Sequence, residues 1–418
     1  MRYGSLSDHF TGIVAKRLSA VETDPAKSNQ HEFNGTTALR HLLTDAGFEN
    51  RPARFVRLGE DGENQSDDAF ITWYDARANH PTRNEWRLYY QTNAVMSAAV
   101  EGDLLIVGRR PDGELLFLVA AQGSTLENQM AWLFGLDGGL GGEFRFEGFQ
   151  GDGDKSLDFV SSYILNEIGI AAEQPEVDRL DEVVARFGLV FPSSRVFSDL
   201  ARTSALAPDP RDDPDAALLA WIEYEEALFR RLERHIVAER LKSGFMVNGI
   251  ADVDGFLQFS LSVQNRRKSR MGLSFENHVE YALTTLDVRH ERGAKTEGNS
   301  KPDFLFPGSA AYQNPAFDPA NLTMLGVKSS LKDRWRQVLA EAQRIPQKHL
   351  LTLEPGISVR QTDEMRCNEV QLVLPAGLHR TFIPDQTAWL MTFRQFANMA
   401  TVRQNHQARL NTTTGATR

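Results

Sequence analysis

Short apolar runs separated by polar loops dominate residues 1–175 of this chain. The runs Ala69–Tyr74 and Trp86–Tyr90 are rich in aromatic and β-branched residues, which favour strands. A second pair, Asp103–Val107 and Glu114–Val119, flanks an Arg-Arg-Pro-Asp-Gly sequence with the composition of a tight turn. The pattern predicts an N-terminal unit made mainly of β-strands, with a hairpin in its second half.

Helical periodicity begins after a proline-rich connection at Ala205–Asp215. Asp213 can cap a helix that has Pro214 as its first residue, and Gly244 can end it. Between these signals, apolar residues recur on one helical face: Leu218, Ile222, Phe229, Leu232 and Ile236. We expect this helix to pack against the core or a partner chain, and we expect a second helix around Leu273–Leu283.

The C-terminal region alternates strand patterns with helical ones. Four short apolar runs predict buried strands: Phe304–Phe306, Leu322–Val327, His349–Leu353 and Val370–Leu374. Lys332–Arg344 has helical periodicity, with a core stripe formed by Trp335, Val338, Leu339 and Ala342. Helices and strands in this order predict an α/β sandwich around a mixed sheet.

Three charged residues stand at the ends of these predicted elements. Asp303 comes directly before the first strand, Lys328 follows the second, and Glu341 lies beside the apolar stripe of the helix. Mg²⁺ held by Asp303 and Glu341 would polarise a phosphate and acidify a bound water, while Lys328 would hold the phosphate or the nucleophile. The usual nuclease pattern has an acid two residues before the lysine, where this chain has Gly326. A strand-initiating Pro-Asp and a helix with solvated charges would explain the same residues without catalysis.

Charge is distributed unevenly along the 418 residues. The chain has a formal net charge of −10, yet residues 261–350 contain 14 lysine and arginine residues against 9 aspartate and glutamate residues, a net charge of +5. This basic region is densest at Asn265–Arg270. A basic region inside an acidic chain is typical of proteins that bind a phosphate backbone.

The length predicts two domains rather than one core. A single cysteine, Cys367, excludes an internal disulfide and a thiolate zinc site, and it suits the cytoplasm. No apolar run approaches the roughly 18 residues that a membrane span needs, so no membrane association is expected.

Three segments of the second half resemble the C-terminal domain of the EcoRII family of restriction endonucleases: Gln264–Gly272, Glu297–Pro307 and Val327–Gln337. The likeness continues more thinly to the N-terminus, through Lys16–Ala20 and Thr82–Glu85. The family is of type IIE, and its relatives cut duplex DNA at sites built on 5′-CC and GG-3′ around a central base pair. Its second acid follows the lysine, as in the arrangement described above.

The resemblance implies a catalytic domain with the PD-(D/E)XK-type α/β fold, which uses Mg²⁺ held by Asp303 and Glu341. The catalytic residues that it implies are Asp303, Lys328, Glu341, Tyr312, Glu276 and Arg266. For phosphate contacts, the basic run supplies Arg267, Lys268 and Arg270. Without the resemblance, Glu276 would be a surface helix residue and Tyr312 a half-buried phenol.

The resemblance also implies base reading in the major groove by Lys332, Asp333 and Arg334. Arginine and lysine bond guanine O6 and N7, while aspartate accepts from cytosine N4, which suits consecutive C·G pairs. Arg334 and Glu341 are seven residues apart, two turns along one face of an α-helix, which would join base reading to catalysis.

A further family position, near the pocket for a flipped central base, corresponds to Tyr224. Ala220 stands where the family has an arginine beside it. This departure leaves the identity of the central base pair, and the flipping of that base, open.

In the N-terminal half, Arg83, Asn84, Glu85 and Arg87 resemble one DNA-binding arm of the family's B3-like β pseudobarrel. His31 resembles the other arm. Trp86 replaces a basic residue of the family, which would weaken binding. A solvated hairpin end is the alternative interpretation of these residues.

Taken together, the resemblance implies an effector-binding domain over residues 1–180, a linker over 181–215 and a catalytic domain over 216–410. It implies a cytoplasmic, homodimeric type II restriction endonuclease that binds two or more copies of a CCWGG-like site. The N-terminal domain would inhibit cleavage until it binds a second site. A cognate DNA methyltransferase would be a functional rather than a physical partner.

Two other functions are compatible with parts of the sequence. A DNA-binding regulator could retain a degenerate nuclease fold, although a pure binder gains nothing from a complete set of Asp303, Lys328 and Glu341. A repair nuclease would not need the base-reading triplet.

Overall fold

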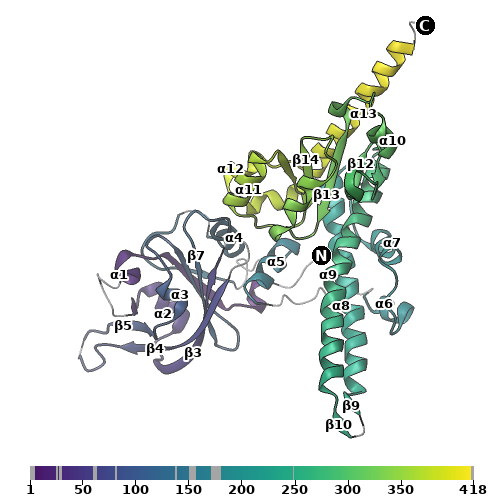
Figure 1. Cartoon of the computed structure of the whole chain (residues 1–418). Coiled ribbons are helices and arrows are strands. Elements are labelled where there is room, and N and C mark those ends of the chain that lie inside the picture. The colour runs from purple at the N-terminus through teal and green to yellow at the C-terminus, as the bar shows by residue number, and fades with distance from the viewer. Residues whose placement is uncertain are drawn as a thin grey trace.

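The computed structural model describes residues 5–24, 27, 31–59, 64–80, 82–136, 139–149, 157–170, 180–247 and 249–415. Two sheets organise the chain, one near each end, and long helices lie beside the second (Figure 1). No helix among these residues is both long enough and apolar enough to cross a membrane.

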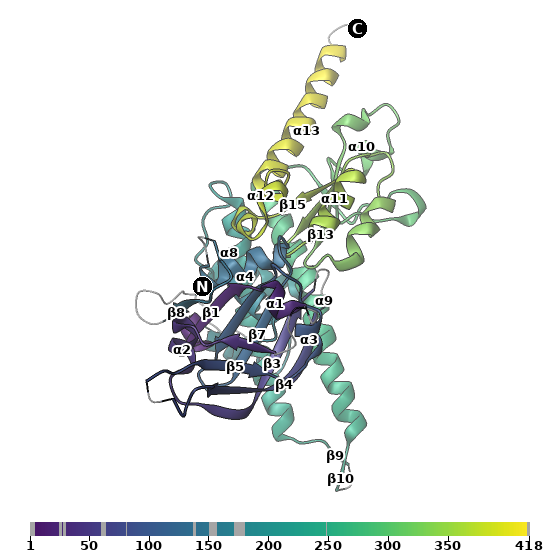
Figure 2. The ribbon, with the colours of Figure 1, turned by 90° about the vertical axis from the view of Figure 1, so that its left-hand side faces the viewer.

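The N-terminal sheet has eight strands in the order β2-β5-β4-β3-β7-β6-β1-β8. Its strands are β1 (Gly12–Arg17), β2 (Glu32–Asn34), β3 (Phe48–Leu58), β4 (Gln65–Asp75), β5 (Trp86–Tyr90), β6 (Leu104–Arg109), β7 (Leu115–Ala120) and β8 (Arg145–Gly148). Only β3 and β7 pair in parallel; the other neighbours are antiparallel. The predicted strands and the β6–β7 hairpin are confirmed, and Figure 2 shows the sheet curving around its own core.

The middle strands of this sheet are buried on both faces. Leu105 and Val107 of β6 point into the concave core, whereas Leu104 and Ile106 join a second apolar cluster on the outer face. Helices cover the sheet: η1 (Leu6–Asp8), α1 (Ala20–Thr23), α2 (Thr37–Leu43), α3 (Ala94–Ser97), α4 (Thr125–Phe134) and α5 (Phe159–Glu167). Burial on both faces explains why these strands are continuous apolar runs rather than alternating ones.

Two antiparallel helices, α8 (Pro214–Lys242) and α9 (Val253–Thr285), form an arm that ends in the small hairpin β9 (Met246–Val247) and β10 (Ile250–Ala251) (Figures 1 and 2). The capping prediction for α8 is confirmed, because the Asp213 side chain accepts from the Ala216 amide and Pro214 is the first residue. The second helix is much longer than predicted. Packing against α8 offsets the low helix propensity of the glycines within it.

The expected linker over 181–215 needs a correction, because α6 (Leu180–Phe187) and α7 (Ser194–Ser204) occupy most of it. Phe197 and Ala201 of α7 are buried against Leu228 of α8. The helices therefore pack onto the C-terminal part instead of forming a free connection. Whether the limits of the expected domains are also units of folding stays a prediction.

The C-terminal sheet has the order β11-β12-β13-β14-β15. Its strands are β11 (Glu291–Arg292), β12 (Phe304–Phe306), β13 (Thr323–Lys328), β14 (Lys348–Thr352) and β15 (Val370–Val373). The first three pair antiparallel and the last three parallel, which confirms the mixed sheet. The surrounding helices are η4 (Glu297–Asn299), α10 (Ser309–Gln313), η5 (Pro319–Asn321), η6 (Lys332–Ala340), α11 (Val359–Cys367), η7 (Ala376–Thr381), α12 (Pro384–Thr387) and α13 (Phe393–Gly415).

The two sheets are connected by a continuous apolar cluster that runs from the outer face of the N-terminal sheet through α4 and α5 to the C-terminal sheet. Polar contacts reinforce it. Thr125 of α4 donates to the carbonyl of Ile357 at 3.1 Å, and Gln129 donates to the carbonyl of Pro355 at 2.5 Å. The N-terminal unit therefore rests directly on the loop that follows β14.

Candidate active site

Strands β12 and β13 bring Asp303 and Lys328 together, although they are 25 residues apart in sequence. Asp303 directly precedes β12, and Lys328 is the last residue of β13, its antiparallel neighbour. One oxygen of Asp303, Oδ2, accepts from the Lys328 ammonium at 2.7 Å and from the Val327 amide at 2.6 Å. The predicted positions of Asp303 before one strand and of Lys328 at the end of another are therefore confirmed, and their catalytic roles stay predictions.

Glu341 lies next to this pair, but not on an α-helix as predicted. Residues 332–340 form the 3-10 helix η6, and Glu341 follows it in an extended conformation with φ −89° and ψ 147°. The buried stripe itself is confirmed, since Trp335, Val338 and Ala342 have no exposed surface. A 3-10 helix has three residues per turn, so the two-turn spacing assigned to Arg334 and Glu341 is wrong.

Burial, and then the charge of Asp303, raise the pKa of Glu341 to about 7. Its Oε2 atom is buried and has no hydrogen-bond partner among the described residues. A buried carboxylate oxygen next to a second carboxylate suits a hard cation such as Mg²⁺, which binds through oxygen ligands. No group of three or more His, Cys, Asp or Glu side chains that could hold a metal ion occurs among the described residues. One or two carboxylates are the usual protein ligands of Mg²⁺.

Close packing explains why residue 326 is a glycine. An ideal Cβ at this position would lie 2.8 Å from Cγ1 of Val338 and 3.3 Å from Cδ1 of Leu350. An acidic side chain two residues before Lys328 would therefore collide with η6. The close packing of η6 on β13 excludes the usual acid and leaves Glu341 to supply it.

Glu276 on α9 faces the same site. Burial and the charge of Asp303 raise its pKa, and the guanidinium of Arg292 opposes this by donating to its carboxylate at 2.8 and 3.1 Å. Arg292 lies on β11, where it is paired with Phe304 beside Asp303. Glu276 is therefore within electrostatic reach of the catalytic pair, as the sequence comparison implied, but an arginine holds it.

Tyr312 contacts a different acid. Its hydroxyl donates to Glu297 at 2.6 Å and accepts from the Arg344 amide at 3.1 Å. Burial and the Glu297 hydrogen bond raise the pKa of Tyr312 to about 12, so it is a proton donor throughout the neutral range. The residues around it hold the segment that follows Glu341.

Two arginines of the basic run on α9 are engaged in ion pairs within the protein. The guanidinium of Arg270 is buried and pairs with Glu225 at 2.9 Å and with Glu226, which does not fit the expected phosphate contact. Arg267 is bound to Glu233 at 2.6 Å. Buried acids on α8 therefore bind these two arginines in place of a phosphate. The sequence alone did not show that α8 and the basic run are neighbours.

Two other members of the run differ. Arg266 is exposed and lies 4.3 Å above the ring of Phe191, so no contact links it to Asp303 in this structure. The side chain of Lys268 lies outside the described residues.

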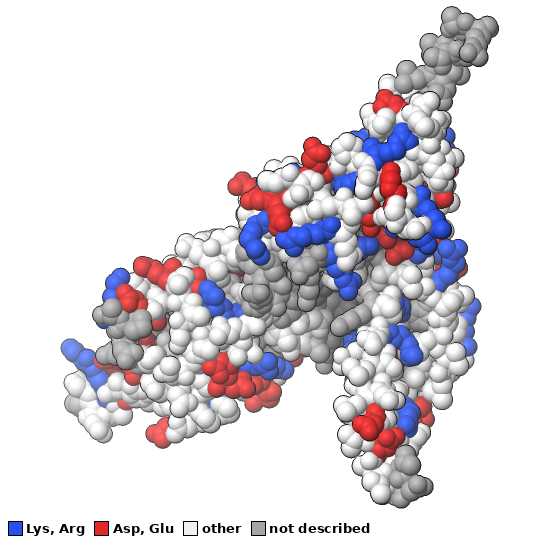
Figure 3. All heavy atoms as spheres, viewed as in Figure 1, with Lys and Arg blue, Asp and Glu red and all other residues white. Residues whose placement is uncertain are grey.

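The expected base-reading residues are divided. Arg334 is exposed on η6, while the side chains of Lys332 and Asp333 lie outside the described residues. Tyr224 is buried in the apolar cluster between α7 and α8, which does not fit a base-contacting surface. Figure 3 shows lysine and arginine side chains on the C-terminal part near the hollow beside the N-terminal unit, with acidic side chains among them.

The expected effector-binding residues lie on and beside the N-terminal sheet. Arg87 of β5 donates from Nη1 to Oδ1 of Asn34 at 2.6 Å. Its Nε donates to Oε1 of Glu85 at 3.1 Å. Arg83 and Asn84 are exposed just before β5. Their exposure is compatible with a DNA-binding arm and equally with a solvated hairpin end, so the predicted role stays a prediction.

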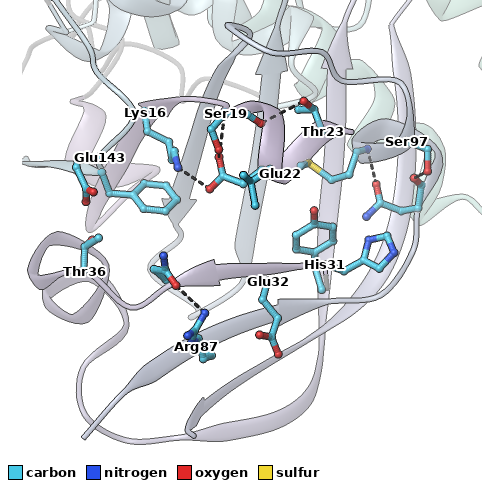
Figure 4. A pocket seen from close by; sticks show the side chains of 17 residues that line it. Lys16, Ser19, Glu22, Thr23, His31, Glu32, Thr36, Arg87, Ser97 and Glu143 are labelled. Carbon is cyan, nitrogen blue, oxygen red and sulfur yellow. Dashed lines mark hydrogen bonds and ion pairs between the residues drawn. The ribbon is translucent and has the colours of Figure 1, made fainter. Parts of the chain in front are cut away.

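His31 and Arg87, one from each expected arm, line the same cavity of about 410 Å³ (Figure 4). His31 stacks edge-on against Tyr90, with 5.5 Å between ring centroids. Lys16 and Glu22 form an ion pair of 2.5 Å in its wall. From the sequence, no role was assigned to this ion pair. The available indication was that Lys16 lies in the segment Lys16–Ala20, which resembles the EcoRII family.

Three further residues of the C-terminal site were missed: Glu297, Arg292 and Lys348. Glu297 opens a segment that resembles the EcoRII family, but no role was assigned to it. Lys348 begins a strand whose residues are all buried. A lysine at such a position is a detectable signal, because buried lysines are almost always paired.

The part of the chain that contains Asp303, Lys328 and Glu341 is similar to known proteins. Residues 229–397 match the family model described as EcoRII C terminal. Over 185 residues the chain is 44% identical to the type II restriction enzyme EcoRII of Escherichia coli, which covers 44% of this chain and 45% of that enzyme.

Two more distant similarities are to other restriction enzymes. The type II restriction enzyme SsoII of Shigella sonnei is 25% identical over 205 residues, which cover 43% of this chain and 65% of that enzyme. A solved complex of the restriction endonuclease PspGI with substrate DNA aligns with 55% of this chain and 98% of its own, at 16% identity and a TM-score of 0.44. The chain spans less than two thirds of both curated enzymes.

Proposed function

We propose that this chain is a type II restriction endonuclease that hydrolyses phosphodiester bonds of double-stranded DNA with Mg²⁺. The observation that carries the proposal is the contact of Asp303 with Lys328 at 2.7 Å beside the buried carboxyl of Glu341, within the part that matches the family model described as EcoRII C terminal. A pure DNA binder has no use for this arrangement.

Each residue of the site has a role in this proposal. Asp303 and Glu341 would hold the cation through carboxylate oxygens. Magnesium, when bound there, would supply Lewis-acid polarisation and lower the pKa of water. Lys328, oriented by Asp303, holds a phosphate oxygen or the attacking water in line. Glu276, restrained by Arg292, adds negative charge beside Asp303.

Recognition is assigned to η6 and its surroundings. Lys332, Asp333 and Arg334 read base edges of a CC/GG-containing, CCWGG-like site. Arg334 has the exposure that such a role needs. Arg266 and Lys268 are left as candidates for backbone contacts, whereas the internal pairing of Arg267 and Arg270 argues against the same role for them.

The N-terminal unit, over about residues 1–180, is proposed to be a B3-like effector domain that binds a second copy of the site. Its cavity with His31 and Arg87, and the exposed Arg83 and Asn84, support this. Its direct packing on the loop after β14 supports inhibition of the nuclease until that site is occupied. Cleavage of both strands would require a homodimer, and a cognate methyltransferase would protect the host's sites.

A digest tests the central proposal. The protein is incubated with a sequenced plasmid and Mg²⁺, and the ends are mapped, with Lys328→Ala as the matched inactive control. Fragments with ends at one short repeated sequence are expected from the wild type alone. Absence of cleavage on plasmids that contain many CC/GG sites, with and without an added short duplex, would refute it.

A further inference from the structure

The segment 341–345 reverses the chain sharply between η6 and β14. Glu341 is extended, and Ala342 after it has a left-handed φ of 46° although it carries a side chain. A residue with a Cβ adopts this conformation only where the surroundings hold it. The position of the Glu341 carboxylate therefore depends on whatever holds this turn.

Lys348 holds the turn from the sheet. Its ammonium donates to three backbone carbonyls, those of Glu341 at 2.5 Å, Ala342 at 2.7 Å and Ile345 at 2.7 Å. Lys348 is only 5% exposed, so all of its donors are used inside the protein. It is the first residue of β14, two before Leu350, and residues at this spacing share one face of a strand. Since Leu350 packs near Val338 and Gly326, this is the face that η6 covers.

A second group of side chains also holds the turn. The Glu297 carboxylate accepts from the Gln343 amide at 3.3 Å, and the Tyr312 hydroxyl accepts from the Arg344 amide while it donates to Glu297. The Arg344 guanidinium in turn donates to the carbonyl of Phe317 at 3.0 Å. The backbone on the C-terminal side of Glu341 is thus fixed by a buried ammonium and by a carboxylate–phenol pair.

We propose that Lys348 and the Glu297–Tyr312 pair are positioning residues, which set the metal affinity of the site by fixing Glu341 opposite Asp303. The proposal rests on the metal-dependent function above. It changes the role of Tyr312 from a group in contact with the reacting atoms to one that acts through Glu341. Residues that orient metal ligands typically change metal affinity by roughly 10- to 100-fold when they are replaced.

The test measures cation binding directly. Mn²⁺ is titrated into the full-length protein without DNA, and the unbound ion is followed by electron paramagnetic resonance. Tyr312→Phe removes one hydroxyl, and Tyr281→Phe, at an exposed tyrosine on α9, is the matched control. Lys348→Met removes the ammonium at similar length. Glu341→Gln removes the ligand itself.

We expect Tyr312→Phe to raise the half-saturating Mn²⁺ concentration roughly tenfold, Lys348→Met to raise it further, and Tyr281→Phe to leave it unchanged. In cleavage assays, excess Mg²⁺ should restore most of the rate to Tyr312→Phe but none to Glu341→Gln. A general loss of folded protein would lower the amount of Mn²⁺ bound without moving the midpoint.

An unchanged midpoint in Tyr312→Phe, with near-ultraviolet circular dichroism matching the wild type, would overturn the proposal, whether or not Lys348→Met folds. So would a wild-type protein whose Mn²⁺ binding is insensitive to Glu341→Gln. A wild type that binds Mn²⁺ with these dependences yet cuts no DNA would refute the nuclease function and leave the positioning roles standing.

Discussion

The C-terminal sheet buries and restrains its charged side chains, whereas the N-terminal unit leaves most of its DNA-binding candidates near solvent. Asp303, Glu341 and Lys348 are each held by named partners within the protein. Arg83 and Asn84 are exposed, and His31 and Arg87 line an open cavity.

This difference has an energetic consequence. A buried charge that loses its partner keeps its desolvation cost, so single substitutions in the C-terminal site should have large effects that do not add. Solvated charges interact weakly and are screened by salt, so substitutions in the N-terminal unit should have small effects. Substitutions in the two regions test this difference.

The largest effect is expected for the catalytic pair. Asp303→Ala or Lys328→Ala should lower plasmid cleavage by roughly a thousandfold or more, because several kcal/mol of charge stabilisation is lost. Binding of the same DNA in Ca²⁺ should stay measurable. Retention of more than a few per cent of the wild-type rate would remove these residues from the active site.

A smaller effect is expected at η6. Arg334→Ala should lose roughly 1–3 kcal/mol of discrimination for each base pair contacted, whereas Lys268→Ala should weaken binding to all sequences and reduce its salt dependence. Competition binding against cognate and random duplexes at several salt concentrations measures both. Equal weakening of cognate and random DNA by the two variants would show that Arg334 does not read bases.

Glu341→Gln should stabilise the metal-free protein at neutral pH. The folded state raises the pKa of Glu341 to about 7, so between its ordinary value and pH 7 the folded state binds the proton more tightly than the unfolded state. The contribution of Glu341 to the free energy of unfolding is therefore favourable at low pH and is lost as the pH rises through 7. With allowance for its partial exposure, the gain at pH 8 should be on the order of 1 kcal/mol.

Urea unfolding of both proteins in EDTA, at pH 4.5 and pH 8, measures this difference. The variant should be more stable than the wild type at pH 8 only. A wild type that is the more stable of the two at pH 8 would contradict the raised pKa.

The smallest effects are expected in the N-terminal unit. Arg83→Ala or Arg87→Ala should blunt, by a few-fold, the acceleration that a short cognate duplex gives the full-length protein on a one-site plasmid. Arg110→Ala, at an exposed hairpin on the same sheet, is the control. If neither substitution alters the response, the two expected arms do not bind the effector.

Limited proteolysis examines the boundary between the two units. Cleavage is expected between residues 205 and 213, outside α6 and α7, because helices packed on α8 resist proteases. The fragments should stay associated after cleavage, since a continuous apolar cluster joins the two units. Fragments that separate on a sizing column would show that this contact is weak.

Much of the architecture followed from local sequence signals. The strands β12 to β15, the cap of α8 at Asp213 and the placement of Asp303 and Lys328 at strand ends were all predicted, because each depends on residues within a few positions. The acid–lysine pair also followed, since two adjacent strands bring their ends together.

Other features depended on contacts between distant residues. Local periodicity could not distinguish the 3-10 helix η6 from an α-helix, so it misplaced Glu341. The sequence predicted that Arg270 contacts phosphate. In the folded chain α8 places Glu225, 45 residues away, in contact with it. The restraint of Glu341 by Lys348 and Tyr312 arises in the same way, from partners on other elements. The sequence by itself determined which charges and elements exist, whereas the tertiary structure decided which charges are neutralised inside the protein and which stay available to a ligand, because only packing sets the distance and the solvent around each charge.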